Sequence, residues 1–123
     1  MNEAFAMAEE SETKRISAET IGQTLVVRLK MKMMDDKDLS ALGELIEPAG
    51  PSTGIHVIVL DMSKVTILSS LAMGILVELT EKCKRRKQNL KLAEVAPSSM
   101  QAIKLTHLDR VLHLSDTVDV AIE

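Results

Sequence analysis

The sequence predicts an α/β fold, built as one domain around a mixed β-sheet. Short apolar runs alternate with helical patterns along the chain, and residues 55–60 form a β-branched, almost wholly apolar run. Such a run is typical of a strand that is covered on both faces in a parallel sheet. Two extended segments before the first helical pattern indicate an opening hairpin. We expect four to five strands and about four helices, joined by right-handed crossovers.

Length and composition also favour one domain. The chain has 123 residues, of which 46% are hydrophobic and 27% are charged. This is enough for a core that needs neither disulfides nor metal. We divide the chain into a flexible acidic N-terminal segment, residues 1–13, and a folded domain, residues 14–123. The single cysteine, Cys83, and a start without the pattern of a secretory signal indicate a reducing cytoplasm.

Charge and aromatic content exclude several classes of partner. The formal net charge is -3, and Phe5 is the only aromatic residue. The charge favours neither nucleic acid nor an anionic membrane, and platforms that stack bases or sugars are excluded. The longest mainly apolar window, residues 65–79, is too short to span a bilayer as a helix. We therefore expect no nucleic acid partner and no insertion into a membrane.

The first half of the chain is predicted to hold a hairpin and a helix. Residues 15–17 and 24–29 suit extended structure, and residues 21–23 between them suit a turn. Carboxylates then stand at the entrance to a helix whose apolar residues share one face, and residues 48–51 end it. The carboxylates are Asp35, Asp36 and Asp38, and the apolar face comprises Leu39, Leu42, Leu45 and Ile46.

The second half is predicted to alternate helices with strands. A helix is expected over residues 70–87, a strand over 90–93, a helix from about Pro97, and a strand over 111–114. A last helix begins at Ser115 or Asp116. The first of these helices has an apolar stripe of Leu71, Ile75, Leu79 and Cys83, widened by Ala72, Met73 and Leu76. So broad a face exceeds what one side of a sheet needs, and part of it is expected to be offered to a partner.

The junction between the strand at residues 55–60 and this helix is the strongest candidate for a functional site. A polar turn that starts at Asp61 leads to a helix that opens on Ser69 and Ser70. A helix start has unpaired backbone N–H groups and a partial positive charge, so a serine there can cap the helix or carry a phosphate. Residue types alone leave both roles open.

The same junction resembles a known family. Asp61, Ser63, Val65 and the Ser69–Ser70 pair, followed by an apolar helix, are similar to the sulfate transporter and anti-sigma factor antagonist (STAS) domain. The order of elements from residue 15 to residue 122 fits that family as well. In its anti-sigma factor antagonists the turn reads Asp-Ser-Ser-Gly, and a partner kinase phosphorylates the second serine to release the antagonist. The resemblance places that serine at Ser70, with Ser69 as the second choice.

Three positions depart from the family pattern. Leu68 stands where the family has aspartate, Leu71 where it has glycine, and Met31 where another glycine is expected after the second strand. A glycine beside the serine lets a partner backbone come close, whereas a leucine fills that space. Loss of the aspartate removes a carboxylate that could orient neighbouring groups. The departures weaken the expectation of kinase recognition more than the expectation of the fold.

The resemblance implies a non-catalytic regulatory module that binds an anti-sigma factor with serine kinase activity. ATP would be bound by that partner, so no cofactor is expected on this chain, and a homo-oligomer formed through the same surface stays open. The alternative is a constitutive structural subunit of a signalling complex, or an accessory subunit of a membrane transporter; Leu68 and Leu71 favour it, because apolar patches suit permanent contacts. The residues expected to contact the partner are Ser63, Leu68, Ser69, Ser70, Leu71, Ala72 and Met73.

Other candidates have simpler explanations. The cations of residues 82–87 could attract an acidic partner, but they also complement the helix dipole. Cys83 could be reactive, although its place on the apolar stripe favours an inert core cysteine. His56, His107 and His113 lack metal-ligand spacing, and the aspartates at residues 35–38 are better explained as solvated helix-start carboxylates than as a cation loop. No catalytic pattern is visible, and an enzyme would require a deep polar pocket lined by titrating residues.

Overall fold

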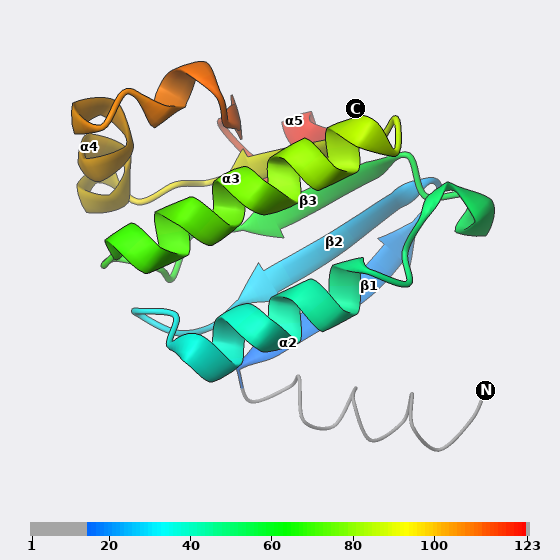
Figure 1. The fold of residues 1–123 in the computed structure, drawn as a ribbon, viewed down its shortest axis with the longest axis horizontal. Helices are drawn as coiled ribbons and strands as arrows, with labels where there is room; N and C mark the ends of the chain where they lie inside the picture. The colour runs from blue at the N-terminus through cyan, green and yellow to red at the C-terminus, as the bar shows by residue number, and fades with distance from the viewer. Residues whose placement is uncertain (1–14, 123) are drawn as a thin grey trace.

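The fold is a mixed five-stranded sheet with helices on both faces (Figure 1). The computed structural model describes residues 15–122. Within them the strands lie in the order β1-β2-β3-β4-β5; β1 and β2 are antiparallel, and the remaining neighbours are parallel. The predicted α/β class, opening hairpin and four helices are confirmed. The N-terminal segment of residues 1–13, predicted to be flexible, lies outside the described residues.

The opening hairpin is longer than the sequence pattern predicts. Strand β1 spans Ile16–Ile21 and strand β2 spans Thr24–Leu29, so Ile21 belongs to the strand and not to the turn. The register runs from Ile16 opposite Leu29 to Ile21 opposite Thr24. Only Gly22 and Gln23 remain as the loop, and Gly22 has a φ of 61°, a conformation that two-residue hairpin loops favour. Pairing along the whole of β2 therefore extends β1 beyond its predicted end.

After the hairpin, helices alternate with strands. Helix α2 spans Asp36–Ile46, β3 spans Val57–Asp61, α3 spans Ser70–Arg85, β4 spans Asn89–Ala93, α4 spans Pro97–Leu105, β5 spans His113–Ser115 and α5 spans Val118–Ile122. Two 3-10 turns, Pro51–Thr53 and Leu108–Arg110, lie in the connections. The last helix begins later than predicted, because Ser115 pairs with Ala93 and ends β5.

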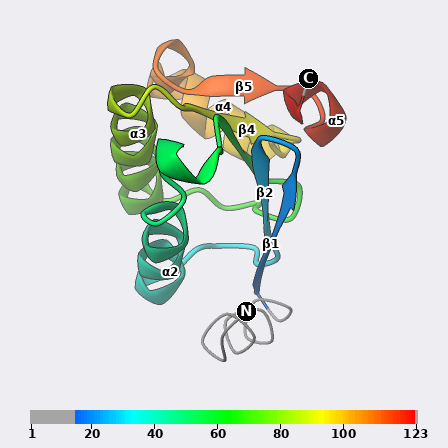
Figure 2. The same ribbon diagram turned by 90° about the vertical axis from the view of Figure 1, so that its right-hand side faces the viewer.

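The helices divide unequally between the two faces of the sheet. Helices α2 and α3 lie on one face, where they bury the main core, and the short helix α5 lies on the other (Figure 2). On the second face Val118 and Ala121 of α5 pack with Val26, Val59 and Ala93. Strand β3 is central, as predicted, and Ile58, Val59 and Leu60 are fully buried between the two layers.

The apolar stripe of α3 starts one residue later than predicted. The buried residues of this helix are Ala72, Met73, Leu76, Leu79, Thr80 and Cys83. Leu71, by contrast, is 55% exposed. Each step of four residues turns a helix by about 40° more than one full turn, so a stripe spaced only by fours drifts around the axis. Two steps back from Leu79, Leu71 has turned away from the core.

One helix-start carboxylate is buried, which corrects the expectation that all three are solvated. Asp35 caps α2 by accepting from the Asp38 amide, and Asp38 accepts in return from the Asp35 amide. Asp38 is only 5% exposed and receives two hydrogen bonds from the Arg15 guanidinium, at 2.7 and 2.6 Å. Because the guanidinium favours the ionised form, the pKa of Asp38 lies below its usual value. The ion pair ties the start of β1 to the start of α2.

Candidate functional site

Three loops meet at the edge of the sheet where β2, β3 and β4 end, which we call the carboxyl edge. The register places Arg28, Asp61 and Ala93 side by side near those ends. The loops that follow lead into the starts of α2, α3 and α4. In α/β sheets this edge commonly holds the functional site, because loops from several strands converge there. The predicted junction of residues 61–70 is the central loop of the three.

The junction is a tight turn anchored by two buried side chains. The Ser63 amide donates to Asp61 Oδ1 at 3.0 Å, and the Val65 amide donates to the Met62 carbonyl at 3.0 Å. Met62 and Val65 are fully buried, whereas Ser63 and Lys64 between them are exposed. The short turn therefore presents Ser63 to solvent while its apolar flanks hold it on the core.

The two serines at the start of α3 have different surroundings. Ser69 is the N-cap, and its Oγ accepts a hydrogen bond from the Ala72 amide at 3.1 Å. Ser70 is the first residue of the helix and is exposed, and its hydroxyl makes no hydrogen bond within residues 15–122. The capping role that the sequence left open between them thus falls to Ser69. The Ser70 hydroxyl lies at the positive end of the helix and has no hydrogen-bond partner among the described residues.

The predicted partner-binding residues fall into two groups. Ser63, Ser70 and Leu71 are exposed, and Ser69 is half-buried. Leu68, Ala72 and Met73 belong to the core and are only 8%, 1% and 8% exposed. Leu68 was predicted to add to an apolar patch on the surface. That prediction is wrong, because its side chain is buried. These three side chains therefore offer a partner little exposed surface.

Two exposed apolar residues at the carboxyl edge were not predicted from the sequence. Ile67 is 55% exposed and Met33 is 47% exposed. Ile67 lies between Ser63 and Ser70 in the junction, and we call the exposed set of Ser63, Ile67, Ser70 and Leu71 the junction surface. Met33 belongs to the loop after β2. No spacing rule marks either residue, because apolar residues in a loop can be buried, as Val65 is, or exposed, as Ile67 is.

The positions that depart from the family pattern also differ in burial. Met31 is 6% exposed and Leu68 is 8% exposed, so both add apolar contacts to the core. Leu71 alone points its bulk to the surface, next to Ser70 in the chain. Two of the three departures are thus absorbed by packing, and one changes the exposed surface.

Cys83 is confirmed as a core cysteine. Its side chain is fully buried, and burial raises the pKa of its thiol. A raised pKa keeps the thiol protonated at neutral pH, which makes it a poor nucleophile. Within residues 15–122, no group of three or more His, Cys, Asp or Glu side chains is arranged to hold a metal ion.

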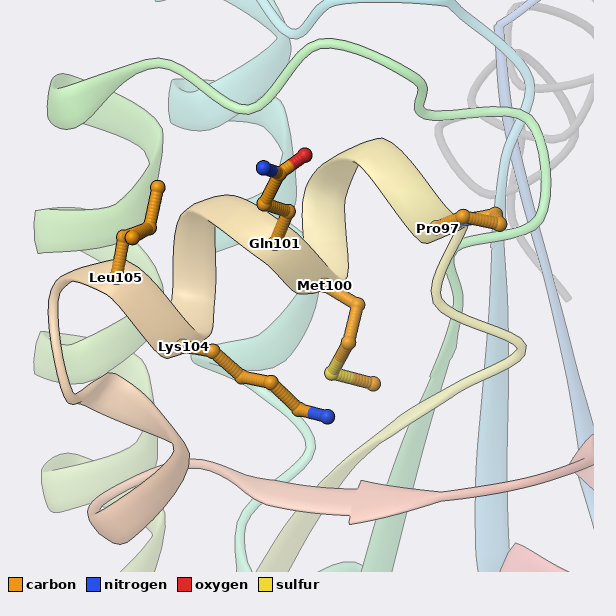
Figure 3. A pocket seen from close by; sticks show the side chains of 5 residues that line it. All are labelled: Pro97, Met100, Gln101, Lys104 and Leu105. Atoms are coloured by element: carbon orange, nitrogen blue, oxygen red, sulfur yellow. The ribbon is translucent and has the colours of Figure 1, made fainter.

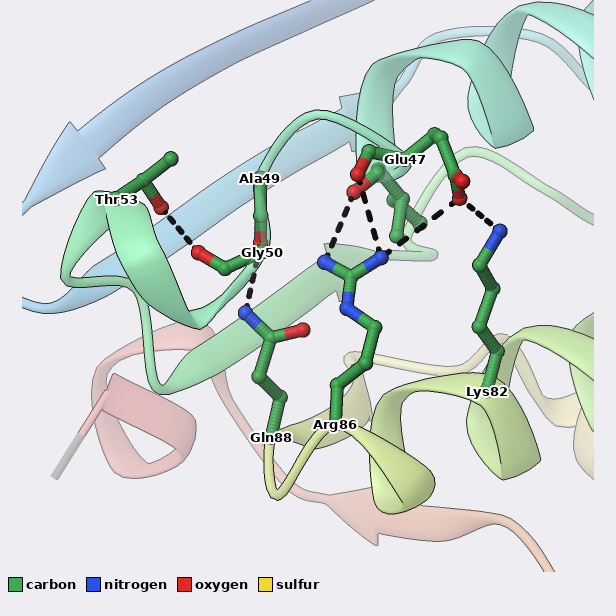
Figure 4. Close-up of polar contacts among 8 residues, drawn as sticks. Glu47, Ala49, Gly50, Thr53, Lys82, Arg86 and Gln88 are labelled. Carbon is green, nitrogen blue, oxygen red and sulfur yellow. Dashed lines mark hydrogen bonds and ion pairs between the residues drawn. The ribbon is translucent and has the colours of Figure 1, made fainter.

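Two cations of the basic cluster at the end of α3, Lys82 and Arg86, are engaged within the protein (Figure 4), whereas Lys84, Arg85 and Lys87 are exposed. Lys82 pairs with Glu47, and Arg86 donates to the carbonyls of Glu47 and Ile46, each at 3.3 Å. Gln88 donates to the carbonyls of Ala49 and Ile55 at 2.7 and 2.8 Å. These bonds fasten the connection between α2 and β3 to the end of α3, which supports a structural role for Lys82, Arg86 and Gln88.

A surface hollow on α4 offers no catalytic arrangement. It is lined by Pro97, Met100, Gln101, Lys104 and Leu105, all from α4 itself. Figure 3 shows Gln101 and Met100 pointing to different sides of the helix. Catalytic sites bring polar groups from several elements together, and this hollow brings together none.

Comparisons with known proteins agree with the observed topology. The family model of the STAS domain matches residues 10–121, so the chain belongs to the STAS domain family. Its structural neighbours include anti-sigma factor antagonists, and also the murine Slc26a9 anion transporter and a stressosome structure. Within residues 15–122, no helix is long and apolar enough to cross a membrane.

Three of these neighbours show how far the likeness extends. An anti-sigma factor antagonist from Mycobacterium paratuberculosis is 25% identical, with a TM-score of 0.72 over 87% of this chain and 89% of that chain. An anti-sigma-factor antagonist (STAS) domain protein from Planctomyces limnophilus is 18% identical, with a TM-score of 0.71 over 88% and 94%. The Bacillus cell fate determinant SpoIIAA in its phosphorylated form is 16% identical, with a TM-score of 0.67 over 87% and 96%.

Proposed function

We propose that this protein is a non-catalytic regulatory module that binds an anti-sigma factor with serine kinase activity through the junction surface. Phosphorylation of Ser70 by that partner would release the complex. ATP would be bound by the kinase, and the complex would form in the cytoplasm. Membership of the STAS family and the likeness to anti-sigma factor antagonists support this choice of partner class.

The observation that carries the proposal is the division of labour between Ser69 and Ser70. Ser69 already caps α3, so modification of Ser70 leaves the cap in place. Ser70 is exposed and carries no structural hydrogen bond within the described chain, so a kinase could reach its hydroxyl without unfolding the helix. A residue that serves as a switch must be accessible to the kinase, and its hydroxyl must not be needed for folding. Ser70 meets both conditions.

The physical effect of a phosphate at this position would be local. It adds roughly two negative charges and several acceptor oxygens, which the unpaired N–H groups of a helix start accommodate. Leu71 follows the modified residue directly and Ile67 precedes it by three residues; each is 55% exposed. A strongly hydrated dianion among them would oppose an apolar contact, because its desolvation is costly. Folding would persist and docking would be lost.

A second candidate function is favoured by the exposed apolar residues. Leu71 makes the junction surface more apolar than the family's glycine at that position would, and the exposed Ile67 adds to its apolar area. Permanent interfaces are more apolar than transient ones, so a constitutive subunit of a signalling complex or transporter would use the same surface without a switch. Burial of Leu68 weakens this alternative, because one of the two leucines on which it rested faces the core.

Incubation with an anti-sigma kinase encoded by a neighbouring gene, together with ATP, separates the two functions. We expect mass spectrometry to find a phosphate on Ser70 and none on Ser69. Substitution Ser70→Ala should remove the modification and retain binding. Binding without any modification at Ser70 would favour the constitutive subunit.

A binding series tests the surface itself. Ser70→Asp should weaken binding at least tenfold, while Ser40→Asp, which puts the same charge on an exposed position of α2, should leave it unchanged. Leu71→Gly should alter the affinity without altering the fold. Equal binding by Ser70→Asp and the wild type, with both folded, would contradict the proposed switch.

A further inference from the structure

The junction surface is held from two sides by hydrogen bonds to other elements. On one side the Lys32 carbonyl, in the loop after β2, accepts from the amides of Thr66 and Ile67, both at 3.0 Å. On the other side the first turn of α4 supplies two hydroxyls. Ser99 Oγ donates to the Val65 carbonyl at 2.8 Å, and Ser98 Oγ donates to the Thr66 carbonyl at 2.6 Å. The three residues before Leu68 are thus bonded across the whole carboxyl edge.

The two serines of α4 differ in burial. Ser99 is fully buried, whereas Ser98 is exposed. A buried hydroxyl must be paired, and a buried carbonyl that loses its donor remains unsatisfied, so the bond from Ser99 is costly to remove. The bond from Ser98 competes with water and is cheap to replace. Neither hydroxyl caps α4, whose N-cap, Ala96, makes no side-chain bond.

We propose that Ser99 is a positioning residue for the junction surface: its buried hydroxyl fixes Val65, and through it the exposed side chain of Ile67, in the geometry that binds the partner. The inference rests on the proposed function for the identity of that partner. Ser99 itself is buried and touches no partner. It acts by holding the segment of residues 65–67 against α4 while Lys32 holds the same segment from the other side.

This arrangement lowers the cost of binding. A loop that is already fixed in its bound geometry loses little conformational entropy when the partner docks. The bonds to the Lys32 carbonyl also bring the loop that carries Met33 beside Ile67. Release of Val65 from α4 would loosen this joint between two loops, so the free protein would sample geometries that do not bind.

The effect of Ser99 can be measured without a partner, by amide hydrogen exchange followed by NMR. In Ser99→Ala we expect the Thr66 and Ile67 amides to exchange roughly tenfold faster, the factor expected for loss of one buried hydrogen bond. Amides in the centre of α3 should keep their wild-type rates. The matched control is Ser98→Ala, which removes the neighbouring exposed hydroxyl and should change these rates less than about twofold. Ser99→Thr keeps a hydroxyl and should restore slow exchange.

Binding to the anti-sigma factor of the proposed function then tests the consequence. Ser99→Ala should weaken binding roughly tenfold, and Ser98→Ala and Ser99→Thr should bind like the wild type. Unchanged exchange at Thr66 and Ile67 in Ser99→Ala, or faster exchange with unchanged affinity, would overturn the inference and leave the proposed function standing. Absence of binding by the wild type would instead contradict the proposed function, and with it the docking role of Ser99.

Discussion

The two ends of helix α3 differ in how far their side chains bond within the protein. At its C-terminal end, Arg86 and Gln88 donate to four backbone carbonyls in the last residue of α2 and the connection to β3, and Cys83 is fully buried. At its N-terminal end, Leu71 is exposed and the Ser70 hydroxyl has no partner within residues 15–122. One end is closed by internal bonds, and the other leaves apolar and polar groups to solvent.

This difference indicates that the C-terminal end of α3 serves the stability of the fold, whereas the N-terminal end serves recognition of a partner. Arg86 and Gln88 at the closed end bond to backbone carbonyls within the protein, although Arg86 Nε and Gln88 Oε1 are buried without a hydrogen-bond partner in residues 15–122, so substitutions there should change the free energy of unfolding. Groups at the open end contribute little to folding, so substitutions there should change binding. Similar separations are common, because exposed groups on loops at the carboxyl ends of strands can vary without cost to the core.

The largest expected effect lies at the closed end. Gln88→Ala removes the donor to the carbonyls of Ala49 and Ile55 and leaves both without their side-chain partner. We expect the free energy of unfolding to fall by about 2 kcal/mol, because an unsatisfied buried acceptor such as the Ile55 carbonyl costs about 1–3 kcal/mol. The Ala49 carbonyl adds less, because its bond is only part-buried. Urea denaturation measures the change. Gln101→Ala, on the exposed side of α4, is the control and should stay within about 0.5 kcal/mol. Equal effects of the two substitutions would show that the end is not closed in the sense described.

A smaller effect is expected from the ion pair between Arg15 and Asp38 at the start of α2. Because the pKa of Asp38 is lowered in the folded state, the pair contributes stability above the unfolded pKa, and the contribution is lost as the pH falls through the folded pKa. Asp38→Asn should therefore lower the free energy of unfolding by about 1–2 kcal/mol at neutral pH, a value reduced for the half-exposed Arg15 side chain.

The pH dependence distinguishes this ion pair from simple packing. The gap between wild type and Asp38→Asn should narrow as the pH drops below about 4, where carboxylates take up protons. Urea denaturation at pH 7 and pH 3 gives both values. Asp36→Asn, at an exposed carboxylate in the same turn, should show a gap below about 0.5 kcal/mol at either pH. A gap for Asp38→Asn that is constant with pH would contradict the role of charge.

The smallest effect lies at the open end, where the two serines can be compared directly. Ser69→Ala removes the cap of α3 and should lower the free energy of unfolding by about 1 kcal/mol. Ser70→Ala should leave it within about 0.5 kcal/mol. Thermal or urea denaturation of the two variants beside the wild type gives the difference. The reverse order would assign the cap to Ser70 and remove the main support for its role as a switch.

Much of the fold was predictable because it follows from local patterns. The buried run that became β3, the apolar face of α2 and the serines at the start of α3 all depend on neighbours close in the chain. Errors arose where a distant element decided the outcome. Strand β1 was extended by its pairing with β2, and Asp38 was buried by Arg15, which lies 23 residues away.

The candidate site was predictable in its location but not in its composition. Asp61, Ser63 and the two serines marked the junction from the sequence. The burial of Leu68 and the exposure of Ile67 could not be inferred, because both are apolar residues in the same short loop. Which of two adjacent apolar side chains enters the core depends on where β3, α3 and α4 leave room, and no periodicity operates in a loop.

The sequence by itself determined the class of fold, the order of its elements and the position of the junction, since hydrophobic period and helix-start chemistry are local properties. Only the tertiary structure decided that Ser69 caps while Ser70 is exposed, that Leu71 faces solvent while Leu68 does not, and that Ser99 reaches Val65 across 34 residues. These outcomes depend on the packing of elements that are distant in the chain, because burial and hydrogen-bond partners exist only once those elements have met.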